Sequence, residues 1–152
     1  MENKIIKLSS LKADLARESA GDWIEYPLWA GAAFNVSSFH KPEYQTARDL
    51  LVARMSRESR GKKQPTGAET RAAYGELFCE HILHGWRGFD IVYTPDTARE
   101  ILTDPAYRVI YDAVEWCAGQ LALVEAEFVE DAGKNSEQPS AGGSKGKQLA
   151  TG

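Results

Sequence analysis

The chain has 152 residues, enough for one ordinary domain, and its 43% hydrophobic and 26% charged residues are typical of a globular protein that needs no metal or disulfide to fold. Its formal net charge of −4 argues against a dedicated nucleic-acid binder, whose phosphate contacts need a positive surplus on one face. No stretch approaches the roughly 20 apolar residues of a membrane span, and the N-terminus has no signal-peptide pattern. We therefore expect a soluble, cytoplasmic protein without membrane contact.

The first part of the chain predicts a short helix and then a β-hairpin. The segment SSLKADLARESAG combines a serine start with a glycine stop, which suits a helix. The next segment, DWIEYPLWAGAAFNVSSF, is rich in aromatic residues and is interrupted by Pro27 and Gly31, which favours a hairpin over about 22–39. Because an isolated hairpin is only marginally stable, it must pack on helices.

Helix start signals dominate the rest of the chain. Proline is tolerated in the first turn of a helix, and three segments begin with one: Pro42, Pro95 and Pro105. Thr66 and Glu69 match a capping box, in which each side chain satisfies an unpaired amide at the helix start. Apolar residues then recur at spacings of three and four. The predicted helices run over about 42–59, 66–84, 95–102 and 105–131.

Together these elements predict a mainly α fold with a small N-terminal β-hairpin (α+β). We expect a single compact helical domain over 1–132. After Asp131 the sequence AGKNSEQPSAGGSKGKQLATG replaces apolar periodicity with glycine, serine and lysine, a composition typical of disordered chain. A flexible polar tail is therefore predicted over 133–152.

The stretch EHILHGWRGFD and the residue before it contain the candidates for metal or catalytic chemistry, Cys79, His81 and His84. Two histidines three positions apart on a helix could reach one metal ion, which would make the chain a metal-dependent enzyme. The zinc protease signature, however, needs histidines four apart with a glutamate after the first, and here Ile82 follows His81. The favoured interpretation is a helix end, with no catalytic residue, no metal and no cofactor.

A short basic patch lies at the end of the helix predicted over 42–59 and in the loop behind it. It contains Arg54, Arg57, Arg60, Lys62 and Lys63. Such a patch could contact an acidic partner or nucleic acid, although a solvated helix end is its commoner meaning. Direct nucleic-acid binding is not expected.

Aromatic residues crowd the predicted hairpin and the turn after the helix predicted over 66–84. Most should belong to the core, but exposed aromatics on a small protein without catalytic groups favour a protein-binding surface. The candidate partner-binding residues are Trp29, Phe39, Trp86 and Phe89.

The order of these features resembles the tail assembly chaperones of long-tailed bacteriophages and prophages. In that pattern an aliphatic helix runs into a W-x-G turn, then a Y-[ST]-P-x-x-A-x-x-[IL]-L segment, then an Asp-Pro helix start. Here the matching residues are Trp86, Gly88, Tyr93, Thr94, Pro95, Ala98, Ile101, Leu102, Asp104 and Pro105. The resemblance spans nearly the whole predicted domain.

The resemblance implies a non-catalytic role in the cytoplasm of a bacterial host. Tail assembly chaperones bind the tape measure protein, keep it soluble and recruit the major tail (tube) protein. A longer form often arises by a −1 ribosomal frameshift, and Gly133 to Asn135 is compatible with slippery codons, so a frameshift-extended form of the chain itself is a possible partner. A minor structural or tail-completion protein of a phage or prophage particle remains an alternative, as does the metal-dependent enzyme.

Overall fold

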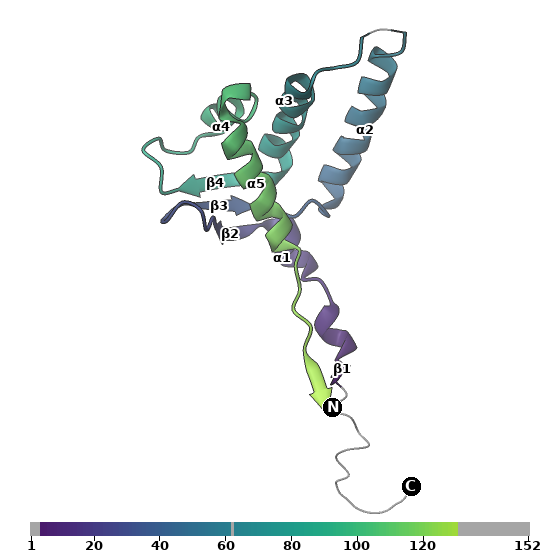
Figure 1. Ribbon diagram of the computed structural model, residues 1–152, viewed down its shortest axis with the longest axis vertical. Coiled ribbons are helices and arrows are strands. Elements are labelled where there is room, and N and C mark those ends of the chain that lie inside the picture. The colour runs from purple at the N-terminus through teal and green to yellow at the C-terminus, as the bar shows by residue number, and fades with distance from the viewer. Residues whose placement is uncertain (1–3, 62, 131–152) are drawn as a thin grey trace, which may run out of the picture. The chain divides into compact units, whose positions relative to one another are not determined.

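The computed structural model describes residues 4–61 and 63–130, and it divides the chain into two compact units (Figure 1). The larger unit comprises residues 13–123. The smaller one comprises residues 1–12 and 124–152, of which 4–12 and 124–130 are described. The sequence predicted one domain over 1–132, so this division differs from the prediction. The tail predicted over 133–152 lies outside the described residues.

A three-stranded antiparallel sheet forms the base of the larger unit. Strands β2 (Asp22–Glu25) and β3 (Ala33–Val36) make the predicted hairpin, and β4 (Leu83–Arg87) pairs with the other edge of β3. Phe34 in the central strand lies opposite Ile24 on one side and Trp86 on the other. Because cross-strand partners share a face of the sheet, these three apolar side chains lie together.

Helices complete the larger unit. They are α1 (Leu15–Ala20), α2 (Pro42–Glu58), α3 (Gly67–Leu77), α4 (Pro95–Leu102) and α5 (Arg108–Leu121). Helix α5 packs across β2 and β3, while α4 lies against both α3 and α5, and α2 runs beside α3 (Figure 1). The structure therefore confirms the predicted α+β class with its small N-terminal hairpin.

One apolar core lies between the sheet and these helices. Phe34 and Phe78 are almost fully buried, and the Phe78 ring stacks on Tyr111 of α5 with a centroid distance of 4.8 Å. Burial of this kind stabilises the fold by roughly 25 cal/mol for each Å² of apolar surface removed from water. The other buried members include Val36, Tyr44, Leu51, Leu77, Ile82, Leu83, Ala98, Leu102, Val114 and Cys117.

Local helix signals in the sequence are found where they were predicted. Thr66 and Glu69 form both hydrogen bonds of the capping box, at 3.0 and 2.7 Å. The hydroxyl oxygen of Thr94 accepts from the amide of Thr97 ahead of α4. Asp104 caps only a 3-10 turn, η3 (Pro105–Tyr107), and α5 begins immediately after it. These contacts span three residues or fewer, which is why sequence alone predicts them.

The predicted helix over 66–84 needs a correction at its C-terminal end. Helix α3 ends at Leu77, a π-helical turn, η2 (Phe78–Ile82), follows, and Leu83 is already extended. From Leu83 on the backbone pairs with β3, whose hydrogen-bonding edge would otherwise be open. Long-range pairing thus outweighs the helical tendency of the last predicted turn.

The predicted helix over 105–131 also needs a correction, because α5 ends at Leu121. Beyond it the sequence VEAEFVE alternates apolar and acidic residues, a period that fits a strand better than a helix. In the smaller unit, β5 (Phe128–Glu130) pairs antiparallel with β1 (Lys4–Ile6), and the Ser10 hydroxyl accepts from the Glu127 amide. A 3-10 turn, η1 (Leu8–Leu11), follows β1.

Gly88 follows the last residue of β4 and has a φ of 92°, a conformation that residues with a Cβ rarely adopt. A Cβ at this position would also overlap the carbonyl oxygen of Gly31 and lie 2.8 Å from the Cα of Ala32. Gly31 offers a matched control, because its φ is 88° but a Cβ there would meet nothing within 4 Å.

We predict that Gly88→Ala lowers the free energy of unfolding more than Gly31→Ala does. The positive φ costs about 1–3 kcal/mol at either position, and only Gly88→Ala adds the overlap with Gly31 and Ala32. Urea denaturation followed by circular dichroism measures both values. Equal losses for the two variants would contradict the importance of this close approach.

Candidate functional site

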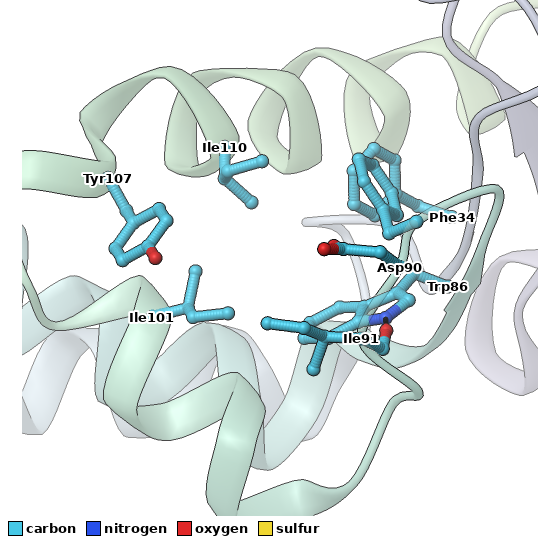
Figure 2. A pocket seen from close by; sticks show the side chains of 8 residues that line it. Phe34, Trp86, Asp90, Ile91, Ile101, Tyr107 and Ile110 are labelled. Carbon is cyan, nitrogen blue, oxygen red and sulfur yellow. Dashed lines mark hydrogen bonds between the residues drawn. The ribbon is translucent and has the colours of Figure 1, made fainter.

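An apolar pocket of about 120 Å³ opens in the larger unit, between the connection that follows β4 and the helices α4 and α5 (Figure 2). Its walls come from one strand of the hairpin, from the end of the sheet and from the two helices. The lining residues are Phe34, Trp86, Phe89, Asp90, Ile91, Ile101, Tyr107 and Ile110.

Aromatic packing builds one wall of this pocket. The Phe89 ring lies 5.6 Å from that of Phe34 and 6.2 Å from that of Trp86, between ring centroids. The indole N–H of Trp86 donates to the carbonyl oxygen of Ile91 at 2.8 Å. This hydrogen bond joins the connection to the strand, so the wall is held by both packing and a partly buried polar contact.

The opposite wall is helical and partly open to solvent. Ile101 of α4 and Ile110 of α5 are half-buried and point toward each other across the space in Figure 2. At the rim, Tyr107 is 43% exposed and Ile91 is 47% exposed. A rim of exposed apolar side chains around a preformed pocket is the arrangement expected where a partner or ligand binds.

Asp90 brings the one carboxylate into this lining. Figure 2 shows its side chain extending into the space between the aromatic wall and the helical wall. Among the described residues, no ion pair or side-chain hydrogen bond involves it. Asp90 as a whole is exposed to solvent. The pocket is therefore apolar on most sides, with one solvated carboxylate directed toward its open space.

The structure brings only two of the four predicted partner-binding residues into the pocket, Trp86 and Phe89. Trp29 is half-buried next to it, with its ring 4.7 Å from Tyr26 and 6.2 Å from Phe89. Phe39 packs elsewhere in the core, against Tyr44 and Phe78. Sequence reasoning named these two lining residues but gave no signal for Asp90, Tyr107 or Ile110, because these join the pocket only through the tertiary fold.

Cys79, His81 and His84, the residues of the alternative metal site considered from the sequence, lie in separate environments. Within residues 4–61 and 63–130, no three His, Cys, Asp or Glu side chains come together as a metal site would need. His81 lies beside Glu80, and His84 lies on β4 instead of at a helix end. Burial raises the pKa of the Cys79 thiol to about 11, so the thiol is protonated near neutral pH, whereas a nucleophilic cysteine reacts as the thiolate.

His84 contacts Ser37 at 2.6 Å between Nε2 and the hydroxyl oxygen, a pair that sequence reasoning did not find. The hydroxyl donates to the carbonyl oxygen of Ser19 at 3.0 Å, so its single proton is used and His84 Nε2 must donate to it. Ser37 is fully buried. An inaccessible hydroxyl facing a donor cannot act as an activated nucleophile, so this pair is structural.

One known protein family matches this chain. The model of the family described as "YdaY prophage protein" matches residues 39–135, more than half of the chain. The chain belongs to the YdaY prophage protein family. The matched range contains every residue that lines the pocket except Phe34. No curated protein and no solved structure matches the chain.

This family membership supports the prophage part of the resemblance found in the sequence. The family description does not mention tails or chaperones, so the tail-assembly role stays a prediction. Among the described residues, no helix is both long enough and apolar enough to cross a lipid bilayer.

The environment of His84 predicts a pH dependence of stability. Burial, followed by the nearby charge of Lys41, lowers the pKa of His84 below its ordinary value of 6.5. The unfolded chain therefore binds a proton more readily than the folded one as the pH falls through 6.5 toward the lowered value. The contribution of His84 to stability is thus full above that window and decreases within it.

We expect His84→Gln, which keeps a donor for Ser37, to lose less unfolding free energy than the wild type between about pH 7.5 and about pH 5. Urea titrations at both pH values measure this difference. His40→Gln replaces a histidine that does not contact Ser37; it is the control and should behave as the wild type does. If His84→Gln lost as much unfolding free energy as the wild type over this pH range, the assignment of the pH dependence to His84 would be contradicted.

Proposed function

We propose that this prophage protein is a tail assembly chaperone, which binds the tape measure protein, keeps it soluble and helps to recruit major tail (tube) subunits. The observation that carries the proposal is the apolar pocket beside α4 and α5, with its exposed rim. The order of sequence motifs around Trp86 and Gly88 and the membership of a prophage family support it.

The size and lining of the pocket suit one side chain of a helical partner. A dry apolar cavity of roughly 150 Å³ in another protein holds benzene, so a pocket of about 120 Å³ has room for about one partner side chain. Recognition of an amphipathic helix commonly uses such anchors, at spacings of three, four and seven residues. A long helical protein such as a tape measure would supply them repeatedly.

The exposed rim of the pocket would add contact area to that of the single partner side chain bound in the pocket. Ile91 and its neighbour Val92 are exposed on the connection, and Tyr107 is exposed beside α5. Burying these apolar groups against a partner is favourable, and covering them would keep the apolar stripe of the partner out of water. That is the physical requirement for keeping an aggregation-prone helix soluble.

The test is co-expression with the product of the neighbouring tape measure gene. We predict that the tape measure protein stays soluble and co-purifies with this chain, and that Ile91→Glu weakens the complex about tenfold, because a charge replaces a buried apolar contact. Leu50→Glu is the matched control, since Leu50 is 67% exposed on α2 and outside the pocket. It should leave binding unchanged.

Two results would contradict the proposal. One is a tape measure protein that is equally soluble without this chain and does not co-purify with it. The other is the presence of this chain at stoichiometric levels in purified particles, which would favour the alternative of a minor structural or tail-completion protein.

A further inference from the structure

The carboxylate of Asp90, an exposed residue that lines the pocket, restricts what the pocket can bind. A neutral apolar group that filled the space would remove water from this carboxylate and give no hydrogen bond in return. Removing water from an unpaired charge is costly, so a neutral occupant that covered this carboxylate would bind less well. An occupant with a positive charge instead turns the same group into a favourable contact.

The rest of the lining also suits a cation on an apolar stem. The rings of Phe34, Trp86 and Phe89 carry electron-rich faces that attract positive charge. Tyr107 lies across the space from Asp90 in Figure 2, and its hydroxyl oxygen offers a second acceptor. The isoleucines of α4 and α5 would contact the methylene groups of the stem.

We infer that the pocket binds a primary alkylammonium group, presented as a lysine side chain on the partner helix. This inference rests on the proposed function and specifies the anchor residue that the partner must supply. Lysine fits better than arginine because its narrow stem ends in a compact charge with three donors, whereas guanidinium needs a wider planar site. The net charge of −4 on the chain would add long-range attraction for a basic partner segment.

The test uses n-pentylammonium chloride as a probe for the lysine side chain and pentan-1-ol as its neutral counterpart. Each is titrated into the full chain while the indole N–H signal of Trp86 is followed by NMR. Binding of so small a probe is expected in the millimolar range. We predict that the ammonium probe binds about tenfold more tightly than the alcohol, because only the ammonium makes a charge-assisted hydrogen bond.

Asp90→Asn should remove this preference and weaken ammonium binding about tenfold, while alcohol binding stays the same or improves. Asp49→Asn makes the same charge change on an exposed site of α2 and should have no effect. Equal affinities of the two probes, no binding of the ammonium probe, or an unchanged affinity in Asp90→Asn would each overturn the inference.

The outcomes separate this inference from the proposed function. If the tape measure protein co-purifies and Ile91→Glu disrupts the complex, but Asp90→Asn leaves ammonium binding unchanged, the chaperone role stands and the lysine anchor is wrong. If the ammonium probe binds in an Asp90-dependent way but the tape measure protein does not co-purify, the cation preference stands and the partner must be sought elsewhere.

Discussion

The pairing of β4 with β3 is the contact on which the rest of the larger unit depends. It joins the hairpin to the end of the α3 helical segment and sets Trp86 opposite Phe34. Where this pairing ends, Gly88 reverses the chain with a positive φ and packs its backbone directly on Gly31 and Ala32. The connection that follows can then place Phe89, Asp90 and Ile91 against the helices. Without that close approach, the connection would not hold Phe89, Asp90 and Ile91 in position at the pocket.

Local signals in the sequence predicted much of the fold, because they act within a few residues. The capping box at Thr66 and the proline starts at Pro42 and Pro95 lie where they were expected. Strand β4 was not predicted, because Leu83–Arg87 becomes a strand only through pairing with residues about 50 positions earlier. Strand β5 was missed for the same reason, since it pairs with residues near the N-terminus.

Two of the residues that line the pocket were named from the sequence, and the others were not. Trp86 and Phe89 were identified from their place in an aromatic turn, and both line the pocket. Asp90 was identified only as the last residue of the stretch EHILHGWRGFD. Its place in the pocket depends on Ile101, Tyr107 and Ile110, which belong to other elements. His84 shows the converse case. Its spacing from His81 suggested a shared ligand, but a strand instead of a helix turns it toward Ser37.

The proposed partner binding depends on a preformed pocket that is apolar on most sides and has one carboxylate in its lining. The smaller unit also exposes apolar residues, with Ile5, Ile6, Phe128 and Val129 each between 43% and 54% accessible. Hydrogen–deuterium exchange on the complex with the tape measure protein compares the two surfaces directly. We predict slower exchange over residues 88–94 and 101–110 than in the free chain. Unchanged exchange there, with protection confined to residues 4–12 and 124–130, would contradict the assignment of the pocket as the binding site.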